Sequence, residues 1–92
     1  MSQVRATLRI RGMVQGVSYR YYTAQTAQAL NLTGWVRNLP SGEVEAILEG
    51  PRSDIQKMIE WCHEGPPAAR VDEVSIDWED GRHEFSDFTI RR

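Results

Sequence analysis

The stretch Val4-Arg-Ala-Thr-Leu-Arg-Ile-Arg11, continued by Gly12-Met-Val-Gln-Gly-Val-Ser-Tyr-Arg20, decides how this chain begins to fold. In its first half apolar and polar residues alternate. One face carries Val4, Ala6, Leu8 and Ile10, and the other carries Arg5, Thr7, Arg9 and Arg11. This alternation predicts a half-buried strand over residues 4–11. The glycine loop then leads into residues 20–31, which lack Gly and Pro and predict a helix, with Ser18 placed to cap it.

The loop from Gly12 to Arg20 also has the features of an anion-binding site. Glycines adopt positive φ and let a ligand approach the backbone closely. A helix that starts after the loop adds unpaired N–H groups, and the guanidinium of Arg20 matches phosphate or carboxylate. An ordinary strand-to-helix turn with a solvated arginine explains the residues equally well, because two glycines without a second motif are a weak signal.

The rest of the chain predicts a hairpin, a second helix and a final stretch of strand. Residues 33–39 and 43–48 are strand-like and flank the turn sequence Pro40-Ser41-Gly42. Ser53-Asp-Ile-Gln56 predicts a capping box for a helix that Gly65-Pro66-Pro67 ends. Its apolar stripe has helical spacing and consists of Ile55, Met58, Ile59 and Cys62. After it, two short apolar runs surround the polar residues 79–84, so the last strand is expected to be broken or bent there.

The order strand, helix, strand, strand, helix, strand predicts a ferredoxin-like α+β sandwich, with an antiparallel sheet and both helices on one face. Residues 1–92 are expected to form one domain. In this topology the first and third strands are neighbours. Their opposite charges share the open face of the sheet, namely Arg5, Arg9 and Arg11 with Glu43, Glu45 and Glu49. Such cross-strand pairs contribute about 0.2–1 kcal/mol each, so we interpret this face as a solvated set of ion pairs and not as a binding surface.

Composition excludes several classes of function. No apolar run approaches the ~20 residues that span a bilayer, and residues 1–5 contain no apolar signal segment, so a cytoplasmic protein without a membrane partner is expected. The net charge of −2 disfavours nucleic acid. An RNA-binding module of this fold would need aromatic residues on its central strands, which carry arginines and glutamates. The single cysteine, Cys62, excludes an internal disulfide, and the first loop has neither a cysteine pair for a metal nor the lysine of a nucleotide-binding P-loop.

The second informative segment is Gly34-Trp-Val-Arg-Asn38, followed by Gly42, Val44 and Gly50. By itself, Asn38 beside a turn is explained by support of that turn. Together with Gly12–Arg20, however, these residues resemble the two signature motifs of the acylphosphatase family, and the resemblance covers residues 4–91. It implies the same fold, and hydrolysis of the carboxyl–phosphate bond of small acyl phosphates. We expect a monomer that needs no metal or cofactor.

The resemblance also implies a role for each motif residue. The phosphoryl group of the substrate, inorganic phosphate or another anion would lie in the loop formed by Gln15, Gly16, Val17, Ser18, Tyr19 and Arg20. Arg20 and Asn38 would be the catalytic residues, with Asn38 orienting the attacking water. One residue departs from the family pattern: Tyr19 stands where the family usually has Phe or Met. Its hydroxyl needs a partner if the ring is buried, so we expect altered loop packing with the activity retained.

These residue types suffice for the implied reaction. The departing carboxylate is the conjugate base of an acid with a pKa near ~4, so no strong acid catalyst is required. A non-catalytic domain that binds an anion in the same loop is the serious alternative. The two differ at Asn38, because a binding protein has no use for an amide that holds water.

Overall fold

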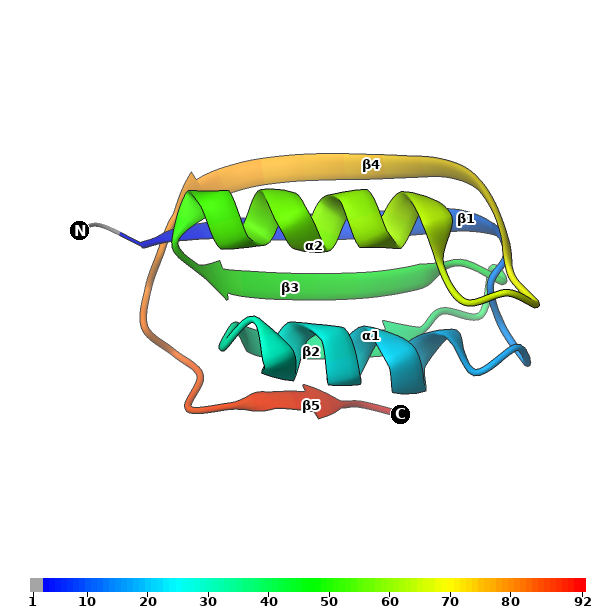
Figure 1. The fold of residues 1–92 in the computed structure, drawn as a ribbon, viewed down its shortest axis with the longest axis horizontal. Helices are drawn as coiled ribbons and strands as arrows, with labels where there is room; N and C mark the ends of the chain where they lie inside the picture. The colour runs from blue at the N-terminus through cyan, green and yellow to red at the C-terminus, as the bar shows by residue number, and fades with distance from the viewer. Residues whose placement is uncertain (1–2) are drawn as a thin grey trace.

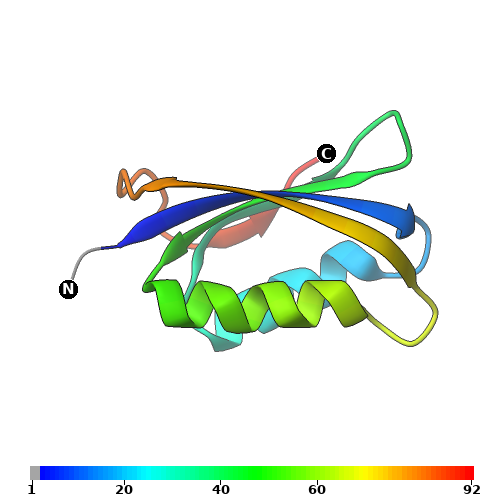
Figure 2. The same ribbon diagram turned by 90° about the horizontal axis from the view of Figure 1, so that it is seen from above.

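The computed structural model describes residues 3–92. Its elements are β1 (Val4–Met13), α1 (Tyr19–Ala29), β2 (Thr33–Asn38), β3 (Val44–Gly50), α2 (Arg52–Glu64), β4 (Arg70–Asp80) and β5 (Phe88–Ile90). Both helices lie on one face of a five-stranded sheet (Figures 1 and 2). The predicted ferredoxin-like α+β architecture is therefore confirmed. Neither helix is long and apolar enough to cross a membrane.

The strand order is β4-β1-β3-β2-β5, with β1 antiparallel to β3, as predicted, and also antiparallel to β4 on its other side. The sheet is mixed and not purely antiparallel, because β5 runs parallel to β2, with Val36 opposite Ile90. The chain after α2 forms two strands on opposite edges of the sheet (Figure 1). Residues 81–87, most of which are polar, separate them, and His83 has a φ of 54°, which an extended strand does not accommodate.

The core lies between the sheet and the helices, where the predicted apolar faces meet. Ala6, Leu8 and Ile10 of β1 are completely buried. The stripe of α2 packs against them, and Met58 and Cys62 on it are also completely buried. Burial of a large aliphatic side chain stabilises the fold by about 1.5–3 kcal/mol, so these contacts fix which face of the sheet the helices cover.

Both helix starts differ from the sequence-based prediction. The helix α1 begins at Tyr19, and Ser18 has a left-handed backbone with a φ of 63° and makes no capping hydrogen bond through its side chain. The predicted capping box of α2 is wrong because the helix begins at Arg52, directly after Pro51, so Ser53 already lies inside the first turn. Pro51 fixes its own φ near the helical value and lets the helix start without a polar cap.

The predicted ion pairs across the open face are present, but only part of that face is solvated. Arg9 pairs with Glu45 at 3.6 Å. At the other end of the face, Arg5 and Glu49 are only 6% and 1% exposed, and the Arg5 Nε and Glu49 Oε2 atoms lie 2.8 Å apart. The expectation that this pair faces water is wrong, because the segment after β4 lies over this end of the sheet (Figure 2).

The covering segment supplies partners to the buried pair. The backbone N–H of Arg82 donates to Glu49 Oε2 at 2.8 Å, and Arg5 Nη2 donates to Glu84 at 2.7 Å. The guanidinium of Arg5 also lies 5.1 Å from the centre of the Phe85 ring. Burial alone raises the pKa of Glu49, but the hydrogen bonds from Arg82 and Arg5 outweigh it and bring that pKa below its ordinary value.

Candidate active site

A cavity of about 200 Å³ lies where the loop after β1, the start of α1, the end of β2 and the end of β5 come together. In Figure 1 these segments meet at the lower right of the molecule, near the chain end marked C. The lining residues are Val14, Gly16, Ser18, Tyr19, Arg20, Tyr21, Asn38 and Ile90. Arg20 is the only member of this lining that carries a charge at neutral pH, so the cavity has a positive character.

The loop between β1 and α1 has the backbone geometry of a concave anion-binding turn. Gly16 and Ser18 have φ values of 76° and 63°, two positions apart. Alternating left-handed residues turn successive N–H groups towards one side, and such concavities bind anions. The left-handed conformation of a serine costs about 1–2 kcal/mol, and strain of this kind concentrates at functional sites.

Gln15 anchors this loop to the hairpin between β2 and β3. Its side-chain amide donates to the carbonyl oxygens of Leu39 and Glu43, both at 2.8 Å. The side chain is therefore engaged, and any contribution of Gln15 to anion binding has to come from its backbone N–H. The same bonds hold the loop close to the end of β2, which carries Asn38.

Arg20 lies in the first turn of α1 and contacts the end of the chain. In place of a carboxylate, its guanidinium donates to the carbonyl oxygen of Arg91 at 3.3 Å. Arg91 is itself held by β2, because its N–H donates to Val36 at 2.8 Å and its guanidinium lies 4.8 Å from the centre of the Trp35 ring. Arg20 is thus oriented by a neutral partner, which leaves its positive charge available to an anion in the cavity.

Asn38 ends β2 on the other side of the cavity lining. Its side-chain oxygen Oδ1 is buried and has no hydrogen-bond partner among residues 3–92. An unpaired buried acceptor costs about 1–3 kcal/mol, so native structures rarely keep one without a reason. A water or a substrate group in the cavity would supply the missing donor.

Tyr19 lies beneath the loop and connects the two helices. Its ring is 1% exposed, and its hydroxyl donates to the carbonyl oxygen of Cys62 at 2.7 Å. A helical partner for that carbonyl would be the N–H of residue 66, which is absent because residue 66 is Pro66. The hydroxyl that the family pattern lacks therefore has a partner, as the sequence analysis required. Burial raises the pKa of Tyr19 well above its ordinary value, so the hydroxyl remains a donor.

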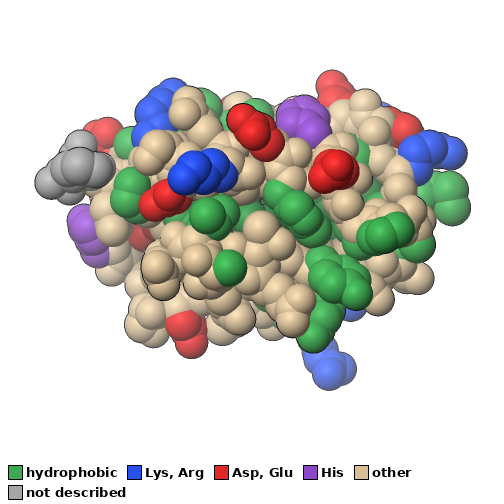
Figure 3. All heavy atoms as spheres, in the orientation of Figure 1, with side chains coloured by type: hydrophobic (Ala, Val, Ile, Leu, Met, Phe, Trp, Pro, Cys, Tyr) green, Lys and Arg blue, Asp and Glu red, His purple; other side chains and the backbone are tan. Residues whose placement is uncertain are grey.

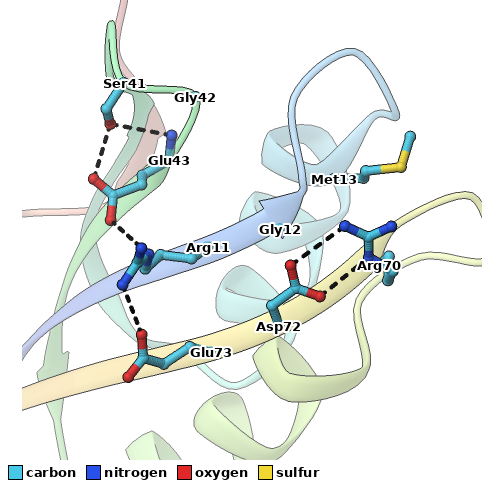
Figure 4. Close-up of a pocket in the computed structure, with 9 residues that line it drawn as sticks. All are labelled: Arg11, Gly12, Met13, Ser41, Gly42, Glu43, Arg70, Asp72 and Glu73. Carbon is cyan, nitrogen blue, oxygen red and sulfur yellow. Dashed lines mark hydrogen bonds and ion pairs between the residues drawn. The ribbon is translucent and has the colours of Figure 1, made fainter.

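A second hollow, of about 620 Å³, lies beside the first residues of β4 and the hairpin turn, but its charges are already paired (Figure 4). Arg11 contacts Glu43 and Glu73, and Arg70 donates to Asp72 at 3.1 and 3.3 Å. Its lining holds two arginines and three carboxylates. An anion would meet a net negative surface there, so the smaller cavity is the better site for a phosphoryl group despite its size.

The structure brings most of the sequence-predicted site residues together. Gly16, Ser18, Tyr19, Arg20 and Asn38 all line the cavity, whereas Gln15 and Val17 of the predicted loop lie outside its lining. Sequence reasoning missed three lining residues: Val14, Tyr21 and Ile90. The position of Tyr21 directly after Arg20 was a usable signal, but Ile90 reaches the site only through the parallel pairing of β5. Within residues 3–92, no group of three or more His, Cys, Asp and Glu side chains could hold a metal.

Known proteins share the sequence pattern and the fold described above. The family model described as Acylphosphatase matches residues 6–90. A relative named acylphosphatase from Geobacter metallireducens is 44% identical over 89 residues, which are 97% of this chain and 96% of that protein. The crystal structure of acylphosphatase from Bacillus subtilis superimposes with a TM-score of 0.94 at 30% identity, over 97% of this chain and 99% of that one. The structure of an acylphosphatase from Coxiella burnetii gives 0.87 at 40% identity, over 98% and 94%.

The class that these findings define is a hydrolase acting on acid anhydrides, built on a ferredoxin-like α+β fold. Its cavity lies beside the first turn of a helix, which is a position that favours anions. The chain belongs to the acylphosphatase family. Its activity is accordingly the hydrolysis of an acyl phosphate to a carboxylate and inorganic phosphate.

Proposed function

We propose that the cavity beside α1 is the active site, that the loop of residues 15–20 with Arg20 holds the phosphoryl group, and that Asn38 positions the attacking water. The observation that carries this proposal is the buried, unpartnered Oδ1 of Asn38 in the lining that also contains Arg20. The guanidinium of Arg20 offers positively charged N–H donors for phosphoryl oxygens, and Asn38 Oδ1 is an acceptor that needs a donor.

The proposed roles follow from the chemistry of each side chain. Phosphoryl transfer depends mainly on positioning and on neutralising charge on the equatorial oxygens, which Arg20 and the loop N–H groups supply. An amide is too weak a base to deprotonate water, so Asn38 accepts a hydrogen bond from the water and thereby aims its lone pair at phosphorus. The water proton passes to a phosphoryl oxygen of the substrate, and the carboxylate leaves without protonation.

A domain that only binds an anion is the alternative. Such a domain would use Arg20 and the loop, but it would gain nothing from Asn38. Stability favours pairing this oxygen within the protein, so its retention beside the cavity supports turnover over simple binding.

The test is release of phosphate from benzoyl phosphate in the presence of a chelator. We expect Arg20→Ala to raise KM and lower kcat, and Asn38→Ala to lower kcat by about 10²–10³ with little change in KM, as for loss of one aligned polar group. Wild-type activity that disappears with the chelator would contradict a metal-independent mechanism. Full activity in Asn38→Ala would contradict the role of the water.

The same residues should make phosphate monoesters poor substrates. An alkoxide leaving group needs a general acid, and the lining of the cavity within residues 3–92 contains no carboxyl group or histidine. Turnover of a simple alkyl phosphate at a rate close to that of benzoyl phosphate would contradict this mechanism.

We propose further that residues 1–92 act as one domain and as a monomer in the cytoplasm. All residues of the proposed site come from one chain. The long edge strand β4 carries Asp72, Glu73, Asp77 and Glu79, and a second copy paired to it would meet like charges. Sedimentation at micromolar concentration and cell fractionation test these two points.

A further inference from the structure

We propose that Tyr21 and Ile90 form an acyl-group subsite that gives this enzyme a preference for acyl phosphates with an apolar, uncharged acyl group. The inference rests on the proposed function, because it requires the phosphoryl group to lie in the cavity beside α1. It adds a specificity surface for the carbon side of the substrate.

The cavity lining combines polar groups with apolar side chains that are exposed at the surface. Arg20 and Asn38 supply the polar groups, whereas Tyr21 and Ile90 are 54% and 44% exposed and line the same cavity. Only four large hydrophobic residues of the described chain are this exposed, and two of them stand here. Figure 3 shows hydrophobic side chains at the surface over the N-terminal half of α1, while charged side chains gather over α2.

The ring of Tyr21 is held in place before any ligand binds. The side-chain amide of Gln25 donates to its hydroxyl at 2.9 Å. The ring of Tyr22 packs against it edge to face, with the ring centres 5.2 Å apart and the planes at 77°. A ring restrained in this way loses little conformational freedom when a ligand packs on it, so its exposed surface is a suitable platform for an apolar group.

Ile90 comes from β5 and is also fixed by the backbone around it. It lies opposite Val36 in the parallel pair, and the N–H of the next residue, Arg91, donates to Val36 at 2.8 Å. The carbonyl of Arg91 then accepts a hydrogen bond from Arg20. The side chain of Ile90 is therefore tied to the same framework as the cation of the site.

The chemistry of the substrate brings its acyl group to these exposed side chains. In an acyl phosphate one bridging oxygen joins phosphorus to the acyl carbon, so a phosphoryl group in the cavity keeps the acyl group within a few bonds of the cavity mouth. The exposed side chains of Tyr21 and Ile90 line this cavity, so an acyl group that extends out of it passes over them. An apolar group therefore gains by covering Tyr21 and Ile90, and a charged one would lose hydration there.

The test compares kcat/KM for benzoyl phosphate and acetyl phosphate, because their ratio in each variant isolates the acyl group. We expect Tyr21→Ala to lower the benzoyl-to-acetyl ratio roughly threefold to tenfold. The loss should appear as a higher KM for benzoyl phosphate, while kcat stays nearly constant. Ile90→Thr keeps a β-branched residue in β5 and should lower the ratio roughly twofold to fivefold.

Two controls separate the subsite from general effects. Tyr21→Phe keeps the apolar ring and should keep the ratio. Met13→Ala removes another exposed hydrophobic side chain, which does not line the cavity, and it should also keep the ratio. A ratio that stays constant in Tyr21→Ala, or that changes equally in Met13→Ala, would overturn the inference.

Failure of this inference and failure of the proposed site give different results. If Arg20→Ala and Asn38→Ala both keep full activity, the phosphoryl group is bound elsewhere and both proposals fall. If those variants lose activity while the ratio in Tyr21→Ala stays at the wild-type value, only the acyl-group subsite is wrong.

Discussion

Replacing Tyr19 by Phe tests whether the hydroxyl beneath the loop stabilises the fold. The change removes one oxygen atom and leaves the buried ring in place. It breaks the hydrogen bond of 2.7 Å to the carbonyl of Cys62. Pro66 offers that carbonyl no N–H, so the oxygen is left buried without a partner in the protein.

The expected cost follows from this burial. An unpaired buried carbonyl costs about 1–3 kcal/mol, so we expect the free energy of unfolding to fall by about 2 kcal/mol. For a chain of this size that loss corresponds to a decrease in Tm of about 8–16 °C. The ring itself still packs against Trp61, at 5.5 Å between ring centres, so no cavity is added to the cost.

Urea denaturation followed by tryptophan fluorescence and by circular dichroism measures the change. Tyr22→Phe is the matched control in the same helix, because Tyr22 is 43% exposed, and it should stay within about 0.5 kcal/mol of wild type. The kcat/KM of folded Tyr19→Phe at 25 °C should remain near the wild-type value. A loss of stability below about 0.5 kcal/mol would refute the argument from the orphaned carbonyl. A large loss of activity would show that the hydroxyl also positions the loop.

Three further outcomes are expected. Glu49→Gln should lower the free energy of unfolding at pH 7 by about 3 kcal/mol in urea denaturation, because it leaves the buried charge of Arg5 with only the half-exposed Glu84 as a carboxylate partner. Since the folded pKa of Glu49 lies below its ordinary value of 4.5, its contribution is complete above that value and is lost as the pH falls through the folded pKa; a variant that keeps the full wild-type acid dependence would contradict this. Burial raises the pKa of the Cys62 thiol to about 12, so iodoacetamide at pH 8 should label it in urea and not in the native protein, as mass spectrometry can show. Gly12→Ala should cost more than about 2 kcal/mol, because Gly12 has a φ of 133° and its new methyl group would meet the backbone of β4, whereas Gly16→Ala has open space and should cost about 1 kcal/mol, both read from thermal denaturation.

The parts of the fold that depend on local patterns were predictable from the sequence. The alternation in β1, the hairpin around Ser41 and the apolar stripe of α2 were all confirmed, because each records which face of an element is buried. The helix starts were not predictable, because a helix can also begin without a side-chain cap, and a sequence motif does not show when it does. At Ser18 the backbone is left-handed, and at Pro51 the proline ring itself sets the first turn.

Local sequence patterns could not predict the position of β5 in the sheet. It has three residues, it pairs in parallel with β2, and it lies on the opposite edge from β4. For the same reason the sequence indicated Arg20 and Asn38, which belong to recognisable motifs, and missed Ile90, which enters the site through that pairing. The buried pair of Arg5 and Glu49 was read as solvated because nothing in the alternation of β1 shows that residues 81–85 cover it.

The central place of β1 also has a consequence for how the chain folds during synthesis. Strand β1 is made before both of its partners, β3 and β4, so Val4 can pair only after Gly50 has been made on one side and Asp80 on the other. Contacts this distant in sequence make folding slow compared with helical proteins of the same size. Until they form, both edges of β1 are open to other nascent chains. The arginines at alternate positions of this strand therefore protect it from aggregation before the glutamates of β3 pair with them.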